Sequence, residues 1–265
     1  MDTTIDGLRL QYEYDGQGSD LVLIHGLGGS LHDWDAFIPD LSRAHRVLRW
    51  DVRGFGQSDK PDGPYTPQLF AHDLAGLVRA LGICKAHVAG ISMGGVIAQR
   101  FTLDYPELVS SLTLISTSSE VSEAAQKAWE KTASIIEQRG FPSNTEAAQR
   151  VFAPSFAHHS PHAVQVMAER IATNDPRAYA AAARAIGSYN WTGELGRIQV
   201  PTLILQGRED VLTPPGGSIK LSRGIPRSRL LMIPDCGHVV PVEKPLLFQQ
   251  TVLAFLAGVD FSRSE

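Results

Sequence analysis

The segment Ala86-His87-Val88-Ala89-Gly90-Ile91-Ser92-Met93-Gly94-Gly95 places a serine between glycines directly after an apolar run. Residues 86–90 are typical of a short buried strand, and residues 96–105 of a helix that Pro106 ends. A serine at so tight a turn from strand to helix has a strained backbone, so its neighbours must be small. The pattern therefore predicts that Ser92 stands above the edge of a sheet as a nucleophile.

Ser92 also has a simpler interpretation, as the residue that caps the start of the helix. Capping requires a serine but does not explain the glycines on both sides, Gly90 and Gly94. A nucleophile at this turn also faces the free N–H groups of the helix N-terminus, which stabilise developing negative charge. The nucleophile is the interpretation that accounts for the whole motif.

Apolar runs on both sides of this turn predict further strands. Residues 8–14 alternate between apolar and polar side chains, which indicates a half-exposed strand, whereas residues 21–24 are continuously apolar, as in a strand buried on both faces. Helices are expected at residues 67–81 and over the last apolar stretch around Phe248 to Leu256. Alternating strands and helices predict an α/β fold, with a mostly parallel sheet between two layers of helices. Further strands are expected at residues 21–24, 46–51, 112–115, 201–206 and 230–233.

The alternation breaks in residues 118–191, where helical patterns follow one another without a strand. We interpret this stretch as a helical lid domain over the carboxyl ends of the strands, where open sheets bind their ligands. A second packing layer without a role in the site is the alternative. The core domain then comprises residues 1–117 and 192–265. Within the lid, helices are expected at residues 120–139, 145–152, 161–172 and 176–186.

A serine nucleophile needs a base, and His238 is the candidate because it lies in a loop between the last strand and the last helix. His25 also follows a strand, but its Gly-Leu-Gly-Gly continuation suits an oxyanion loop better. Three further histidines, His158, His159 and His162, lie close together in the lid. No matching cysteine or carboxylate set accompanies them, so we expect solvated side chains and not a metal site.

The base needs a carboxylate that fixes its tautomer, and Asp210 is the candidate. It follows the strand at residues 201–206, and the resulting order of serine, aspartate and histidine is that of α/β-hydrolases. Glu209 is the adjacent rival. Asp235 is another, although its closeness to His238 in sequence suits a role in bracing the loop better.

An oxyanion hole requires two backbone N–H donors near the serine. We expect them from Met93, directly after the nucleophile, and from Leu27, in the loop after the first buried strand. Large apolar side chains of the core and the lid are expected to wall the substrate pocket, although each is also a plausible core residue. These predicted substrate contacts are Trp34, Trp129, Phe152, Tyr179, Trp191 and Val239.

Composition limits the partners and the location of the protein. With 24 basic and 28 acidic residues, the chain has no basic stripe, which argues against nucleic acid as a partner. The start is acidic and lacks the apolar run of a secretory signal, and no stretch has the roughly 20 apolar residues of a membrane span. Cys84 and Cys236 are not spaced as metal ligands. We expect a cytoplasmic protein with free thiols and with no metal or cofactor.

These motifs together resemble the α/β-hydrolase superfamily in order and spacing, over essentially the whole chain. The resemblance rests on His25-Gly26-Leu27-Gly28, the stretch 51–59, the serine turn, Asp210 and Gly237-His238. It implies the α/β-hydrolase fold and a structural role for residues 51–58.

A narrower resemblance is to 3-oxoadipate enol-lactonases and their esterase-like relatives. Residues 92–95, 175–179, 194–198 and 201–203 are similar to theirs. The pair His25-Gly26 departs from this group and is similar to general esterases and haloperoxidase-like perhydrolases.

The predicted function is hydrolysis of a small carboxylic ester or lactone through an acyl-Ser92 intermediate, with enol-lactonase activity as a specific form. An alternative keeps the same three residues but uses peroxide in place of water, or cleaves a carbon–carbon bond. A ligand receptor without enzyme activity is a third class, which a complete set of catalytic residues disfavours. The oligomeric state is left open by the sequence.

Overall fold

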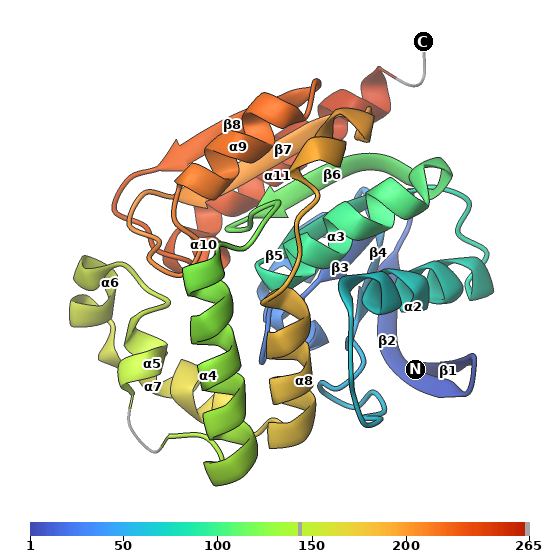
Figure 1. Ribbon diagram of the computed structural model, residues 1–265. Helices are drawn as coiled ribbons and strands as arrows, with labels where there is room; N and C mark the ends of the chain where they lie inside the picture. The colour runs from blue at the N-terminus through green and yellow to red at the C-terminus, as the bar shows by residue number, and fades with distance from the viewer. Residues whose placement is uncertain (143–144, 263–265) are drawn as a thin grey trace.

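The computed structural model describes residues 1–142 and 145–262, whose centre is one eight-stranded sheet (Figure 1). The strand order is β1-β2-β4-β3-β5-β6-β7-β8. Neighbours from β4 to β8 pair in parallel, and β2 pairs antiparallel with both β1 and β4. The mostly parallel sheet of the sequence prediction is confirmed. The strands are β1 Asp2–Ile5, β2 Leu8–Gly16, β3 Ser19–Ile24, β4 His45–Trp50, β5 Ala86–Ile91, β6 Val109–Ile115, β7 Thr202–Gly207 and β8 Ser228–Ile233.

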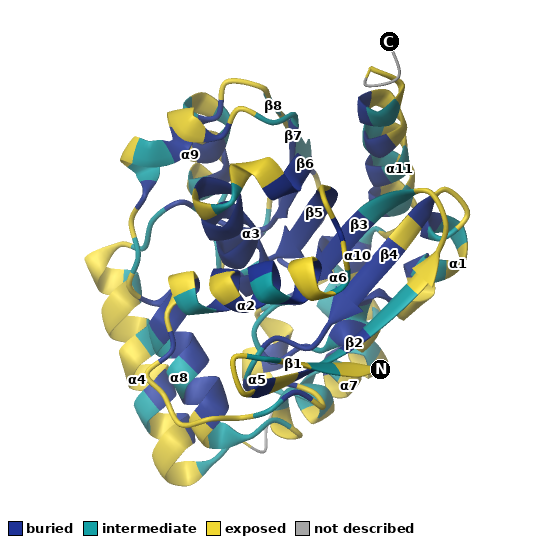
Figure 2. Ribbon diagram, turned by 90° about the vertical axis from the view of Figure 1, so that its right-hand side faces the viewer, coloured by how far each residue is buried: buried dark blue, intermediate teal, exposed yellow. Residues whose placement is uncertain are grey.

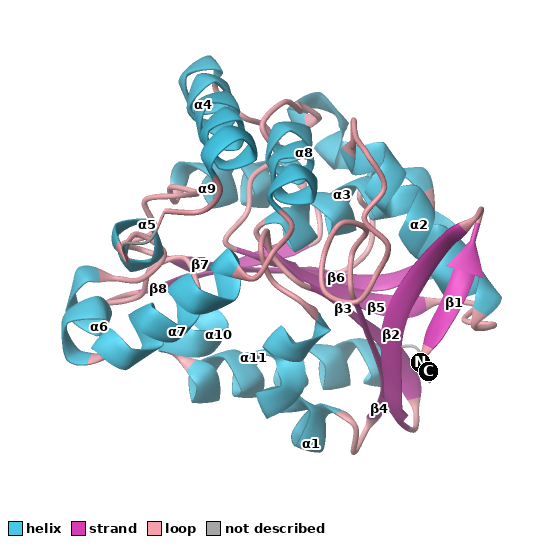
Figure 3. Ribbon diagram, turned by 90° about the horizontal axis from the view of Figure 1, so that it is seen from below, coloured by secondary structure: helices cyan, strands magenta, loops and turns pink. Residues whose placement is uncertain are grey.

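Helices cover both faces of the sheet, as Figure 3 shows in a view from below. Helices α2, α3 and α9 lie on one face, and α1 and α11 lie on the other (Figure 3). The bounds are α1 Ile38–Leu41, α2 Pro67–Ala80, α3 Met93–Asp104, α9 Gly216–Gly224, α10 Val240–Glu243 and α11 Pro245–Phe261. The described residues also form 3-10 helices at Leu31–Phe37, Pro106–Leu108 and Thr192–Arg197.

The central strands are apolar on both sides because each side packs against a helical layer. In β3, Val22 and Ile24 belong to the core cluster that contains Phe101 of α3. Leu21 and Leu23, which alternate with them, belong to the cluster that contains Phe248 of α11. Figure 2 shows the result, with β5 and β6 buried beneath helices whose outer faces are exposed.

A helical insertion, residues 118–191, connects β6 to β7. Its described residues form five helices, and two of these, α4 and α8, pack side by side. Figure 1 shows this pair below the carboxyl end of β6. The division of the chain into a core and a lid domain stays a prediction. The helices are α4 Glu123–Arg139, α5 Glu146–Gln149, α6 Pro154–His159, α7 Pro161–Ala172 and α8 Pro176–Ile186.

Some elements differ from the expectations. Strand β1 was not expected, because its four residues alternate between exposed and half-buried and include no long apolar run. Helices α6 and α9 were also missed, one of them because it is short and the other because it begins with two glycines. Helix α3 begins at Met93, three residues before the predicted start. None of the described helices is long and apolar enough to cross a membrane.

Candidate active site

Ser92 lies at the turn between β5 and α3, with the unusual backbone angles φ 55° and ψ −116°. A positive φ is strained for a residue with a side chain. The two glycines make the turn possible: a Cβ on Gly90 would lie 2.2 Å from the Gly94 carbonyl oxygen, and a Cβ on Gly94 would lie 2.2 Å from that of Ile24. The turn therefore needs glycine at both positions, as the motif suggested.

His238 and Asp210 are joined by a hydrogen bond of 2.8 Å between Nδ1 and Oδ2. Both side chains are buried, in loops that follow β8 and β7. Asp210 Oδ1 accepts the backbone N–H groups of Leu212 and Thr213, which fixes the carboxylate in the loop. With its Nδ1 proton donated to Asp210, the imidazole of His238 has Nε2 free to accept a proton.

The charge state of Asp210 suits this role. Burial alone would favour the neutral acid, but the charge of His238 and hydrogen bonds from His238 and Thr213 outweigh it and lower the pKa of Asp210. The two alternative candidates for the acid are Glu209 and Asp235. No hydrogen bond between His238 and either rival is present in the described chain: Glu209 is half-buried, and Asp235 is exposed.

Thr213 is a member of this group that the sequence analysis missed. Its hydroxyl lies 2.7 Å from Asp210 Oδ2, 3.2 Å from His238 Nδ1 and 2.9 Å from the carbonyl oxygen of Ser116 at the end of β6. Thr213 therefore connects the acid and the base to the strand next to Ser92. Its position three residues after Asp210, in a turn that the aspartate side chain caps, was the available signal.

Ser92 and Thr213 line the same pocket, which has a volume of about 320 Å³. In the described residues, no direct hydrogen bond joins the Ser92 hydroxyl to His238. The wall combines loops of the sheet with the insertion, and its apolar members include Met93, Val96, Trp129, Ile186, Tyr189 and Leu212.

The two residues predicted to supply the oxyanion hole, Met93 and Leu27, lie in different segments of the core. Met93 is the first residue of α3, where a backbone N–H has no partner within the helix. Leu27 lies in the loop after β3, next to Gly26, whose Cβ position is 3.6 Å from the Ser92 Cβ. His25 braces this loop: its Nδ1 lies 2.7 Å from the Gly26 carbonyl oxygen, and its Nε2 accepts the N–H of Val52.

Of the six predicted substrate contacts, Trp129 lies in the wall of this pocket. The other five do not line it in the described part of the chain and instead pack against other side chains. Their partners are Phe248 for Trp34, Phe156 for Phe152, Phe141 for Tyr179, Tyr189 for Trp191 and two core clusters for Val239.

Comparison with known proteins agrees with this fold. The family described as alpha/beta hydrolase fold matches residues 21–245. The chain belongs to this family. It is 30% identical to 3-oxoadipate enol-lactonase 2 of Acinetobacter baylyi over 96% of this chain and 95% of that protein.

Solved structures of alpha/beta hydrolases are similar over nearly the whole length. The enol-lactonase of Burkholderia xenovorans has a TM-score of 0.92 at 27% identity, with 97% of this chain and 100% of that chain covered. A thermophilic esterase of Thermogutta terrifontis has a TM-score of 0.90 at 31% identity, with 97% of each chain covered. The resemblance to enol-lactonases is thereby confirmed.

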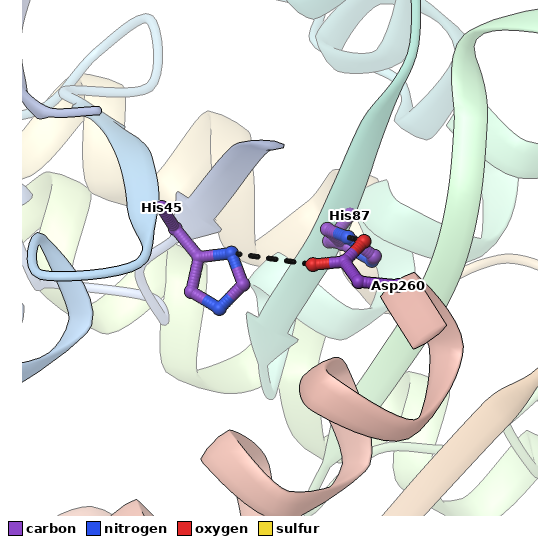
Figure 4. A group of neighbouring side chains, drawn as sticks. All are labelled: His45, His87 and Asp260. Carbon is purple, nitrogen blue, oxygen red and sulfur yellow. Dashed lines mark hydrogen bonds and ion pairs between the residues drawn. The ribbon is translucent and has the colours of Figure 1, made fainter. Parts of the chain in front are cut away.

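This hydrolase also has a polar cluster at the opposite edge of its sheet, at the amino ends of the strands. His45 of β4, His87 of β5 and Asp260 of α11 bring their ligand atoms within 4.8 Å of one another (Figure 4). These are atoms that zinc can bind. Hydrogen bonds already join them, however: Ser19 bridges His45 and Asp260, and His87 Nε2 lies 2.9 Å from Asp260. The cluster fastens the end of α11 to the sheet.

The three histidines of the insertion, His158, His159 and His162, are exposed and form no such group among the described residues. The rings of His158 and His159 lie edge to face, 5.1 Å apart, and His159 Nδ1 lies 2.8 Å from the Ser155 carbonyl oxygen. Both cysteines are free thiols, Cys84 exposed and Cys236 buried.

Proposed function

We propose that this chain is a serine hydrolase that cleaves a small carboxylic ester or lactone through an acyl-Ser92 intermediate. The observation that carries the proposal is the buried pair of Asp210 and His238 beside a pocket whose wall includes Ser92 on its strained turn. An acid, a base and a nucleophile in this order are the set that acyl transfer needs.

In the first step, His238 Nε2 takes the hydroxyl proton of Ser92 while Oγ attacks the substrate carbonyl carbon. The oxyanion that forms accepts hydrogen bonds from the N–H groups of Leu27 and Met93. Asp210 stabilises the imidazolium, which then gives its proton to the departing alcohol. Water, activated by the same histidine, releases the acid and restores Ser92.

The helical insertion acts in this proposal as a lid. Trp129 of α4 and Ile186 of α8 lie in the same wall as Ser92, so the insertion forms part of the pocket. A volume of about 320 Å³ is at the lower end of the usual range for small-molecule sites. This size favours a compact acyl group, and the enol-lactonase and esterase relatives support an ester or a lactone.

A panel of substrates tests the proposal. Turnover is compared for simple esters of rising acyl length and for five- and six-membered lactones, each with water alone and with added peroxide. The proposal predicts turnover of short esters or lactones, with kcat/KM falling as the acyl chain grows. Rates that climb toward long chains would contradict the compact pocket. Halogenation or peracid formation as the dominant activity would contradict hydrolysis.

A further inference from the structure

Glu243 is a buried carboxylate that the mechanism above does not use. It ends α10, five residues after His238, and its side chain accepts hydrogen bonds from two separate parts of the chain. Oε2 lies 2.9 Å from the backbone nitrogen of Ala153, in the helical insertion. Both carboxylate oxygens lie 3.0 Å from the backbone nitrogen of Gly237, directly before the catalytic histidine.

The loop of His238 touches the insertion at a second point. The backbone N–H of His238 donates to the carbonyl oxygen of Val151 at 2.9 Å. Gly237 lies so close to this segment that a Cβ there would be 2.4 Å from the Ala153 nitrogen and 2.6 Å from the Phe152 carbonyl carbon. No side chain fits between the two segments. The backbone around the base is therefore packed directly against the insertion.

Opposing effects act on the pKa of the Glu243 carboxyl, and their net result is a raised pKa. Burial raises the pKa of its carboxyl, and the charge of Asp210 acts in the same direction, whereas hydrogen bonds from the backbone N–H groups of Gly237, Ala153 and Val239 act against both. Removing the N–H donors from a buried carboxylate has a large unfavourable free energy. Moving the loop of His238 away from the insertion would break these hydrogen bonds. The carboxylate of Glu243 therefore opposes this movement.

We propose that Glu243 is a positioning residue that fastens the insertion to the loop of His238, so that the base keeps its place only while residues 151–153 stay docked. The inference rests on the proposed function in one respect, the role of His238 as the base. Glu243 itself does not line the pocket that contains Ser92 in the described residues.

This arrangement predicts which kinetic constant changes. The pocket wall contributed by the insertion comes from α4 and α8, whereas Glu243 holds the segment before α6. A substitution of Glu243 should therefore displace His238 without reshaping the substrate pocket. We expect kcat to fall and KM to stay near its wild-type value.

The test uses Glu243→Gln and Glu243→Asp in the full chain. Glu243→Gln replaces one acceptor oxygen by an NH2 group, which cannot accept a hydrogen bond from a backbone N–H. Glu243→Asp keeps the carboxylate but on a shorter side chain. Val242→Ala is the matched control, because Val242 is exposed on the same short helix. Each variant is measured by circular dichroism, by steady-state kinetics and by amide hydrogen exchange of the peptides that contain Ala153 and Gly237.

The expected order of kcat is wild type, then Glu243→Asp, then Glu243→Gln, with Val242→Ala like wild type. Loss of a hydrogen bond to a charged group predicts that exchange in both peptides speeds up about tenfold or more in Glu243→Gln. Wild-type kcat in a folded variant, or faster exchange in only one of the two peptides, would overturn the proposal. If Glu243→Gln does not fold, Glu243→Asp decides by the same criteria.

Hydrogen exchange also separates this inference from the proposed function. The coupled protection of the two peptides does not depend on catalysis, so the Glu243→Gln change is repeated in a Ser92→Ala background. Suppose that exchange speeds up in both peptides in this background and that activity survives the loss of Ser92. This result would refute the proposed function but not the role of Glu243. If exchange speeds up in only one of the two peptides and Ser92→Ala is inactive, only the role of Glu243 is refuted.

Discussion

The imidazole of His238 meets Asp210 at 2.8 Å, in a loop region where Thr213 contacts both side chains. This pair is buried, and Asp210 is held ionised by its partners. A buried charge needs such partners, so the loop after β7 and the loop after β8 stabilise each other through this contact. The relationship leads to the first two predictions.

Asp210→Asn should cut kcat by about 10⁴-fold, because an asparagine favours the wrong tautomer of His238. Glu209→Gln should change kcat little, since Glu209 makes no hydrogen bond to His238 in the described structure. Steady-state kinetics on the best ester or lactone of the panel measure both. The reverse result would show that the acid has been assigned to the wrong residue, although the fold would stand.

Thr213→Val should lower kcat by about tenfold, a smaller loss than that of Asp210→Asn, because it removes a single hydrogen-bonding hydroxyl near the charged pair. The variant keeps the size of the side chain and the backbone N–H that Asp210 accepts. Kinetics and circular dichroism are measured side by side. A loss as large as that of Asp210→Asn in a folded protein would indicate that Thr213 has a direct chemical role.

Stability should depend on pH through the polar cluster at the other edge of the sheet. Burial and the neighbouring His87 lower the pKa of His45, against the effect of Asp260. The unfolded chain then takes up a proton at His45 near pH 6.5, while the folded chain does so only at lower pH. The contribution to stability is therefore complete above about pH 6.5 and declines as the pH falls below it.

His45→Asn should flatten this decline, and thermal unfolding between about pH 5 and pH 7.5 measures it. His159→Asn is the control, because His159 is an exposed histidine of the insertion. If wild type and His45→Asn lose Tm in parallel over this range, His45 is not the group responsible.

Trp129→Ala should widen the pocket next to Ser92 and shift the preference toward longer acyl chains. Each additional methylene that fits is worth about 1–3 kcal/mol in kcat/KM. Lys127→Ala is the control, because Lys127 is exposed on the same helix and lies outside this pocket. An unchanged profile of kcat/KM against acyl length in Trp129→Ala would show that the acyl group binds elsewhere.

The sequence predicted what depends on local pattern. The glycines around Ser92 are required by backbone contacts within and next to the turn. The turn could therefore be predicted from the motif alone. The buried strands were visible because both of their faces are apolar. Strand β1 has neither a glycine motif nor two apolar faces, and it forms because it pairs with β2.

Contacts made across the fold were harder to predict. Trp34 and Trp129 are both large apolar residues, and only the packing of helices shows that one meets Phe248 and the other the pocket. Glu243 was missed for the same reason, since its partner Ala153 is 90 residues away in sequence. Such contacts depend on how separate elements dock, which periodicity and spacing do not encode.

Covalent labelling and substitution of Ser92 test whether it is the nucleophile. Wild-type protein is treated with a phosphonate, and its peptides are mapped by mass spectrometry alongside kinetics of Ser92→Ala. We expect the phosphonate to modify Ser92 selectively and Ser92→Ala, still folded, to lose about 10⁴-fold or more of its turnover. A Ser92→Ala protein that kept a tenth of wild-type activity, or a label on another residue, would contradict this expectation.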